Sequence, residues 1–218
     1  MSHLAAPVAP DLLLEHELAA SSGASRVAGV DEAGRGALAG PVFAAAVVLP
    51  LGDKFLLNFL DGVRDSKQLS PAAREGYFPL ICERALCFGI GSASAEDIDR
   101  VGILPATRRA MADAIRDLNP AAEALLIDGP IRLERVLLPQ RAIIRGDQRS
   151  LSIAAASVLA KVSRDRYMVA LGERFPDYGF QRHKGYGTAE HRRLLTRLGP
   201  CAEHRHTFAP LRNEFNTD

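Results

Sequence analysis

The chain of 218 residues contains only three cysteines, Cys82, Cys87 and Cys201. Their separations match no metal-ligand spacing, and an odd number of thiols cannot all pair within one chain. A disulfide framework of the kind that supports small secreted domains is therefore not expected, and neither is a cysteine-based metal centre. We expect the three thiols to be buried or idle.

Long apolar segments and positively charged leaders are also missing. No run of 18 apolar residues occurs, so the sequence predicts no membrane span. The first 25 residues contain three acids, Asp11, Glu15 and Glu17, and neither lysine nor arginine. Secretory and transit peptides carry positive charge in this region. These features predict a cytoplasmic protein that works away from membranes, and we expect it to be a monomer.

A strong surplus of either charge is missing as well, because 27 Lys and Arg stand against 26 Asp and Glu. The balance by itself indicates nothing about nucleic acid, but its distribution is uneven. Residues 182–206 contain six Lys or Arg, two acids, four of the six histidines and Tyr186. Such a basic segment is typical of phosphate-backbone binding. A solvated helix face explains Arg192, Arg193 and Arg197 equally well.

Four carboxylates stand at the ends of three predicted strands. They are Asp31 and Glu32 after residues 27–30, Asp128 after residues 125–127, and Asp147 after residues 142–144. Each strand is a short apolar, partly β-branched run that leads into a glycine turn. One such acid would more often be solvated or cap a helix. Because ligands bind at the carboxyl ends of strands in open α/β sheets, four acids at three ends indicate one shared site.

These four acids have little compensating charge along the chain. No lysine adjoins the first pair, and Arg35 and Arg145 could neutralise only part of the set. Hard divalent cations take oxygen ligands, and Mg²⁺ is typically held by carboxylates, waters and phosphates. Two such ions about 4 Å apart can clamp the attacking and leaving oxygens of a phosphodiester. The pattern therefore favours a site for two Mg²⁺ or Mn²⁺ ions during catalysis.

Five sequence blocks, in order, resemble ribonuclease HII, the type 2 ribonuclease H family. The blocks are GVDEAGRG at 29–36, DSKQLS at 65–70, LIDG at 126–129, IAAASVLAKVSRD at 153–165 and HKGYGT at 183–188. The resemblance spans about residues 27–210, nearly the whole chain. Two departures occur: Arg145 stands where lysine is more usual, and Ala37 replaces a common proline. The first keeps the charge, and the second makes the turn less rigid.

The resemblance implies an α/β ribonuclease H-like fold with a mixed five-stranded sheet, flanking helices and a helical C-terminal extension. The sequence pattern agrees with it. Strands are predicted near 27–31, 41–49, 86–93, 124–128 and 141–145, and helices over 103–118, 150–175 and 188–198. The first two strands are too close for a helical crossover, so they should pair antiparallel. The expected organisation is a flexible arm at 1–25, a catalytic domain at 26–212 and a tail at 213–218.

The resemblance also implies an activity. It is the cleavage of the RNA strand of RNA–DNA hybrids, and of duplex DNA on the 5′ side of single embedded ribonucleotides, leaving 5′-phosphate and 3′-hydroxyl ends. Telling RNA from DNA requires a contact to the 2′-hydroxyl. The resemblance assigns that recognition to Gly34, Arg35, Gly36 and Tyr186, since glycines let the backbone approach closely and tyrosine can pack or hydrogen-bond.

Other charged residues carry weaker expectations. Lys67, Arg145 and Lys184 are expected to contact phosphates of the substrate. Asp165 follows Lys161 by four residues on a predicted helix, so a structural ion pair is expected there rather than a metal ligand.

Three alternatives are less consistent with the sequence. The sister enzyme ribonuclease HIII carries an extra N-terminal domain, which the 26 residues before Val27 could not house. Another metal-dependent phosphodiesterase of the superfamily would keep the acids but would not need the Gly34–Gly36 turn or Tyr186. A non-catalytic hybrid-binding module would have no reason to keep four acids that repel phosphate.

Overall fold

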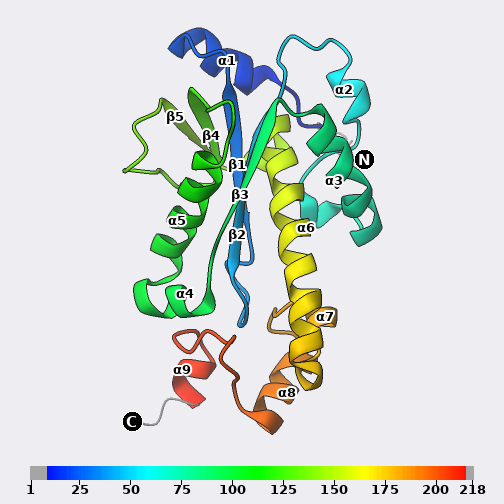
Figure 1. The fold of residues 1–218 in the computed structure, drawn as a ribbon, viewed down its shortest axis with the longest axis vertical. Helices are drawn as coiled ribbons and strands as arrows, with labels where there is room; N and C mark the ends of the chain where they lie inside the picture. Colours follow the sequence, from blue (N-terminus) through cyan, green and yellow to red (C-terminus); the bar gives the residue numbers. More distant parts are fainter. Residues whose placement is uncertain (1–8, 215–218) are drawn as a thin grey trace, which may run out of the picture.

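A five-stranded mixed sheet forms the centre of the computed structural model, which describes residues 9–214 (Figure 1). The strands are β1 (Val27–Ala33), β2 (Val42–Val48), β3 (Cys87–Ala93), β4 (Ala124–Asp128) and β5 (Gln140–Ile143), in the spatial order β3-β2-β1-β4-β5. The pairs β1–β2 and β2–β3 are antiparallel, whereas β1, β4 and β5 run parallel. The predicted mixed sheet and its antiparallel first pair are confirmed.

Helices cover both faces of the sheet and extend beyond one end of it. They are α1 (Leu13–Ser22), α2 (Leu56–Phe59), α3 (Pro71–Arg84), α4 (Ala95–Val101), α5 (Ile103–Arg116), α6 (Leu151–Arg174), α7 (Phe180–His183), α8 (Ala189–Leu198) and α9 (Leu211–Glu214). Short 3₁₀ turns are η1 (Ser66–Gln68), η2 (Gly146–Gln148) and η3 (Pro176–Tyr178). The predicted helices correspond to α5, α6 and α8. None of the helices within residues 9–214 is long and apolar enough to cross a membrane.

The long helix α6 packs on one face of the sheet, and α5 packs on the other (Figure 1). Small side chains over residues 154–157 are buried and let α6 approach β1 closely. Gly29 makes the closest approach possible, because an added Cβ there would lie 2.1 Å from the carbonyl carbon of Ser152. As a result α6 runs directly behind β1, the strand that carries Asp31 and Glu32.

The chain termini differ from the expected organisation. Within residues 9–25 of the expected flexible arm, Leu14 and Leu18 of α1 pack against the sheet. Glu15 is fully buried, and one of its oxygens accepts hydrogen bonds from Ser150 Oγ and from the backbone and hydroxyl of Ser152. Residues 1–8 lie outside the described part, as do residues 215–218 of the expected tail. Helix α9 crosses the expected boundary between domain and tail.

Candidate active site

The three parallel strands end side by side at one edge of the sheet, and this edge carries the predicted carboxylates. Val30 pairs with Ile127 in the last pair between β1 and β4, so Asp31 and Asp128 follow this pair on neighbouring strands. Asp128 ends β4, whereas β1 continues beyond Asp31 and Glu32 to Ala33 in its pairing with β2. Asp147 lies in η2, just beyond β5, which pairs with β4. The backbone N–H of Gly146 donates to Asp128 Oδ1 at 2.7 Å and fixes η2 against β4.

Burial and mutual repulsion raise the pKa values of three of these carboxyl groups, Asp31, Glu32 and Asp147. Burial raises the pKa of Asp31 well above its ordinary value, and the charges of Glu32 and Asp128 raise it further. The pKa of Glu32 is also raised by burial, although Arg35 opposes the shift through a hydrogen bond of 3.1 Å. Burial followed by repulsion from Asp128 raises the pKa of Asp147 to about 6. The structure therefore concentrates negative charge at this edge, where a cation would stabilise it.

Lys67 lies among the carboxylates, which the order of residues along the chain did not indicate. Burial opposes its positive charge, but Asp65 and the nearby site acids together raise the pKa of Lys67. Asp65, which sequence reasoning did not select, caps η1 by accepting from the backbone N–H of Lys67 at 2.9 Å. Its only sequence signal was its place in the second block that resembles the ribonuclease HII family, at residues 65–70, because it does not follow a strand.

The donor set fits a hard divalent cation, since all four predicted ligands are carboxylates. In the observed side-chain arrangement, however, no three His, Cys, Asp or Glu side chains of residues 9–214 are grouped so that they could hold an ion. The charge of Asp128 contributes to the raised pKa values of Asp31 and Glu32, so these side chains already interact electrostatically. Joint ligation would therefore require side-chain rotation at the sheet edge.

The two loops predicted to recognise the ribonucleotide lie against each other next to this edge. The backbone N–H of Leu38 donates to the carbonyl of Gly185 at 2.8 Å and joins the turn after β1 to the Tyr186 loop. Arg35 and Gly36 are exposed at the tip of the turn, whereas Gly34 is buried with a φ of 95°.

Tyr186 is half-buried between α6 and the turn after β1, residues 34–38, which we call the recognition turn. Its ring centroid lies 5.1 Å from the Arg164 guanidinium carbon and 5.3 Å from Lys161 Nζ. Among residues 9–214, no side chain or backbone group forms a hydrogen bond with its hydroxyl. The hydroxyl is therefore free to meet a substrate, as the recognition role requires.

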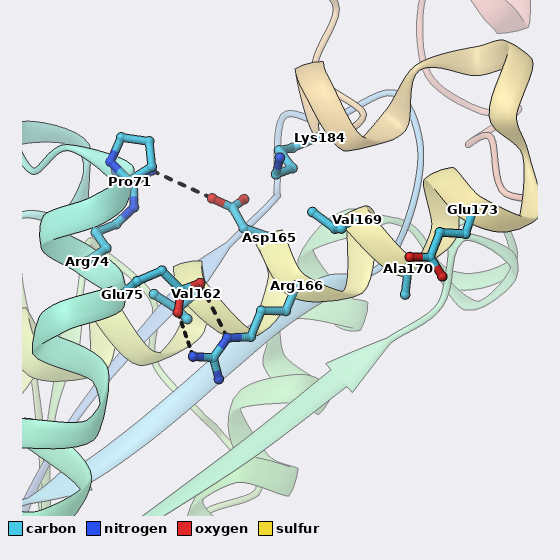
Figure 2. Close-up of a pocket in the computed structure, with 10 residues that line it drawn as sticks. All are labelled: Pro71, Arg74, Glu75, Val162, Asp165, Arg166, Val169, Ala170, Glu173 and Lys184. Atoms are coloured by element: carbon cyan, nitrogen blue, oxygen red, sulfur yellow. Dashed lines mark hydrogen bonds and ion pairs between the residues drawn. The ribbon is translucent and has the colours of Figure 1, made fainter.

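The two remaining predicted phosphate contacts both have left-handed backbone conformations. Arg145 is exposed with a φ of 54°, and Lys184 is half-buried with a φ of 52°. Left-handed conformations are unfavourable for side chains other than glycine, asparagine and aspartate. Lys184 lies on the rim of a groove of about 420 Å³ between α3 and α6 (Figure 2). Its Nζ donates to the carbonyl of Gln181.

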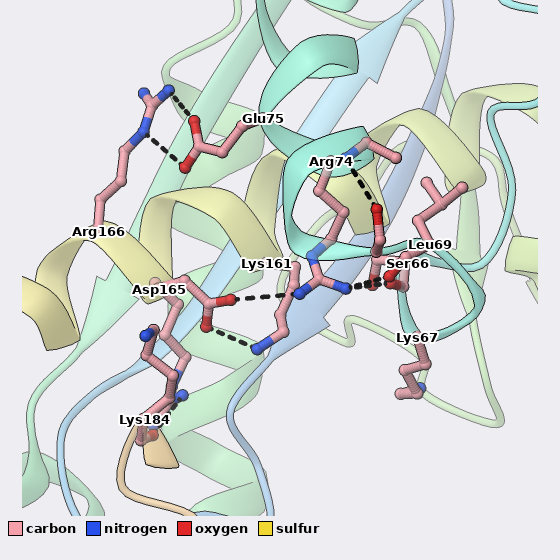
Figure 3. A network of polar contacts seen from close by, with 12 residues as sticks. Ser66, Lys67, Leu69, Arg74, Glu75, Lys161, Asp165, Arg166 and Lys184 are labelled. Carbon is pink, nitrogen blue, oxygen red and sulfur yellow. Dashed lines mark hydrogen bonds and ion pairs between the residues drawn. The ribbon is translucent and has the colours of Figure 1, made fainter. Parts of the chain in front are cut away.

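A polar network that includes Arg74 and Asp165 of this groove confirms the structural ion pair predicted for Asp165 (Figure 3). Lys161 Nζ lies 2.6 Å from Asp165 Oδ1, and Arg74 lies 3.7 Å from Oδ2. The buried Arg74 also donates to the carbonyls of Ser66 and Leu69, each at 2.7 Å. Arg74 therefore braces the turn that carries Lys67, a function that the sequence did not reveal.

The basic segment 182–206 is only partly a surface feature, which corrects the expectation from composition. Arg205, His183, His191 and His204 are buried. His191 Nε2 and His204 Nε2 are 3.1 Å apart, and His204 Nδ1 accepts from the backbone of Cys201 at 3.0 Å. Burial lowers the pKa values of His191 and His204 to about 4. These imidazoles are neutral and hold the Tyr186 loop onto the C-terminal helices instead of facing phosphate.

Acid should destabilise the protein through this buried histidine pair. Folding lowers their pKa from 6.5 to about 4, so the unfolded chain binds more protons and stability falls as pH drops through this interval. Because the two imidazoles are coupled, we expect the unfolding free energy to fall by roughly 3 kcal/mol in all. Thermal unfolding measured from pH 7 to 4.5, with NMR titration of the imidazoles, tests this. Imidazoles that titrate near pH 6.5 in the folded protein would contradict it.

Comparisons with known proteins agree with the geometry. The family model described as Ribonuclease HII matches residues 28–212. The ribonuclease HII of Chloroflexus aurantiacus is 53% identical over 202 residues, which cover 93% of this chain and 94% of that protein. The ribonuclease HII of Syntrophotalea carbinolica is 54% identical over 192 residues, covering 87% and 88%.

Solved structures show the same fold. Ribonuclease H2 from Pyrococcus horikoshii superposes with a TM-score of 0.71 at 24% identity, covering 86% of this chain and 96% of that one. The ribonuclease HII of Archaeoglobus fulgidus, solved in a complex with PCNA, gives a TM-score of 0.66 at 32% identity, covering 79% and 87%. The expected ribonuclease H-like fold is thus confirmed. The chain belongs to the ribonuclease HII family and is a ribonuclease H, a hydrolase with endonuclease activity.

Proposed function

We propose that this enzyme cleaves the RNA strand of RNA–DNA hybrids, and duplex DNA on the 5′ side of single embedded ribonucleotides, with two Mg²⁺ or Mn²⁺ ions. The products would be 5′-phosphate and 3′-hydroxyl ends. The supporting observation is the juxtaposition of carboxylates from neighbouring strand ends with two joined loops. One loop presents exposed backbone at Arg35 and Gly36, and the other presents the Tyr186 hydroxyl.

In this proposal the acids Asp31, Glu32, Asp128 and Asp147 hold the ions. When bound, divalent ions would activate water and stabilise the charge that develops on the scissile phosphate. Lys67 stays protonated beside these acids and offers a positive charge to the same phosphate. The exposed Arg35, which bonds Glu32, can exchange that partner for the substrate.

Discrimination between RNA and DNA is assigned to the two joined loops. A 2′-hydroxyl is both a donor and an acceptor, and the exposed backbone at Arg35 and Gly36 and the Tyr186 hydroxyl can satisfy it. A site built to bond this group rejects DNA because its own polar atoms would otherwise be left unpaired.

The direct test is cleavage of a duplex that carries one ribonucleotide in otherwise all-DNA strands. We expect incision on the 5′ side of the ribonucleotide with Mg²⁺ or Mn²⁺ and no incision in EDTA. An all-DNA duplex of the same sequence is the control. Binding without cleavage in either metal would exclude the proposed reaction and support a non-catalytic module.

The glycines of the recognition turn should respond differently to alanine. Gly34→Ala adds a Cβ 2.0 Å from Arg164 Nε at a positive φ, so it should destabilise the fold by roughly 1–3 kcal/mol. Gly36 has no atom within 4 Å of an added Cβ, so Gly36→Ala should leave stability within about 0.5 kcal/mol. If substrate backbone approaches Gly36, cleavage by that variant should fall roughly tenfold. Unfolding curves and cleavage rates separate the two effects.

Lys184 should contribute to affinity through phosphate charge. Lys184→Ala should weaken binding to all duplexes alike and reduce the slope of log affinity against log salt by about one. Arg182→Ala is the matched control, because Glu190 already offsets Arg182 in an ion pair. Fluorescence anisotropy at several salt concentrations measures both slopes. Equal slopes for wild type and Lys184→Ala would remove Lys184 from the phosphate contacts.

A further inference from the structure

Two fully buried arginines, Arg164 on α6 and Arg205 after α8, lie beneath the recognition loops. Within the described residues 9–214, neither guanidinium has a carboxylate within 4.0 Å. Burial of an unpaired charge is strongly unfavourable, so charged groups in such positions need strong hydrogen bonds. Burial and the neighbouring Arg164 lower the pKa of Arg205 to about 9, which still leaves it protonated at neutral pH.

Both arginines donate all their observed hydrogen bonds to backbone carbonyls of the two loops. Arg164 donates from Nε to Pro41 at 3.0 Å, from Nη2 to Ala39 at 3.1 Å and from Nη1 to Lys184 at 3.0 Å. Arg205 donates from Nη1 to Arg35 at 2.9 Å and from Nε and Nη2 to Gly40 at 3.0 and 2.8 Å. Arg164 thus bridges the two loops, and Arg205 fixes the turn after β1 at Arg35 and Gly40.

The surrounding residues are shaped around Arg164. Gly34 leaves the space that its guanidinium occupies, and the Tyr186 ring lies 5.1 Å from its central carbon. Gly185 lies so close to the neighbouring loop that an added Cβ would be 2.4 Å from the carbonyl oxygen of Ala39. Arg164 is therefore in contact with, or adjacent to, every element to which ribonucleotide recognition is assigned.

We propose that Arg164 and Arg205 are positioning residues that set the distance between the Gly34–Gly36 turn and Tyr186, and thereby the selectivity for a ribonucleotide in DNA. The inference rests on the proposed function. Polar groups that read one hydroxyl must be held within about 0.5 Å, which a network of charged donors on fixed carbonyls can provide. A lysine keeps the charge but lacks the planar fork that reaches three carbonyls at once.

The test compares Arg164→Lys, Arg205→Lys and the control Arg74→Lys. Arg74 is likewise a buried arginine that donates to two backbone carbonyls, but these belong to the turn that carries Lys67 and not to the recognition loops. Each variant is assayed for kcat and KM on a duplex with one ribonucleotide and on a uniform RNA–DNA hybrid, well below its unfolding temperature. Hydrogen exchange at the Leu38 amide, which bonds Gly185, reports the joint between the loops.

We expect Arg164→Lys to lower kcat on the single ribonucleotide roughly tenfold more than on the hybrid, with KM little changed and faster exchange at Leu38. Arg205→Lys should also lower kcat on the single ribonucleotide more than kcat on the hybrid. This second variant keeps the inference testable if Arg164→Lys does not fold. Arg74→Lys should lower kcat on the single-ribonucleotide duplex and on the hybrid by the same factor. If all three variants lose both activities equally, the two arginines are merely structural and the inference fails. A wild-type enzyme that cleaves neither substrate would instead refute the proposed function.

Discussion

Asp31→Asn and Asp128→Asn should each abolish cleavage while leaving the fold intact. Asparagine preserves the shape of the side chain but removes the charge that a divalent ion requires. Loss of several kcal/mol of transition-state stabilisation corresponds to a rate reduction of roughly a thousandfold or more. Single-turnover cleavage of the duplex with one ribonucleotide measures the effect, and circular dichroism checks the fold.

The same substitution at position 31 should stabilise the metal-free protein. Folding raises the pKa of Asp31 above its ordinary value of 3.8, chiefly through burial. Its contribution to stability is therefore favourable at low pH and is lost as pH rises through the folded-state pKa. Asp31→Asn removes this penalty, so its unfolding free energy in EDTA at pH 7 should exceed that of the wild type.

A control carboxylate should distinguish charge at the site from charge in general. Asp113→Asn on α5 removes an acid that pairs with Arg116 at the surface, far along the chain from any strand end. We expect its cleavage rate and its stability to match the wild type within about 0.5 kcal/mol. If Asp31→Asn retained full activity, the carboxylates would not be the catalytic set.

The proximity of Asp31 and Asp128 could be predicted because local sequence determines where buried strands run. Asp31 and Asp128 follow apolar runs that can only be buried strands, and parallel strands place their carboxyl ends at one edge. Tertiary contacts determine the rest. Lys67 was expected only as a phosphate contact, and its position among the acids depends on η1, whose Ser66 hydrogen-bonds Ser157 of α6.

Predictions from composition were wrong where charged or polar residues are buried in the fold. Arg205 and His204 counted toward a basic surface, yet both are buried, and the arginine binds carbonyls. Glu15 lies in a segment that was expected to be a flexible arm, but it accepts hydrogen bonds from Ser150 and Ser152. Polar residues that serve the interior in this way are rare, so a sequence pattern assigns them to the surface.

Tyr186→Ala should lower the cleavage rate on a lone ribonucleotide roughly a hundredfold, far more than it lowers affinity for the duplex. The half-buried ring packs near Arg164 and Lys161, and its hydroxyl has no hydrogen-bond partner among residues 9–214. In the proposed role, the alanine variant would remove both a donor to the sugar and the surface on which the sugar packs. Rates on this substrate and on uniform RNA–DNA hybrid are compared under single-turnover conditions.

Tyr186→Phe separates the hydroxyl from the ring. The ring keeps its place beside Arg164, so stability should change little, whereas loss of one hydrogen bond in the transition state should lower the rate roughly fivefold to tenfold. Because a uniform hybrid offers a 2′-hydroxyl at every position, its cleavage should fall less than cleavage of the lone ribonucleotide in both variants. Equal losses on the two substrates would leave Tyr186 as a general binding residue, and the 2′-hydroxyl at the junction would then have to be read by the exposed backbone of Arg35 and Gly36 alone.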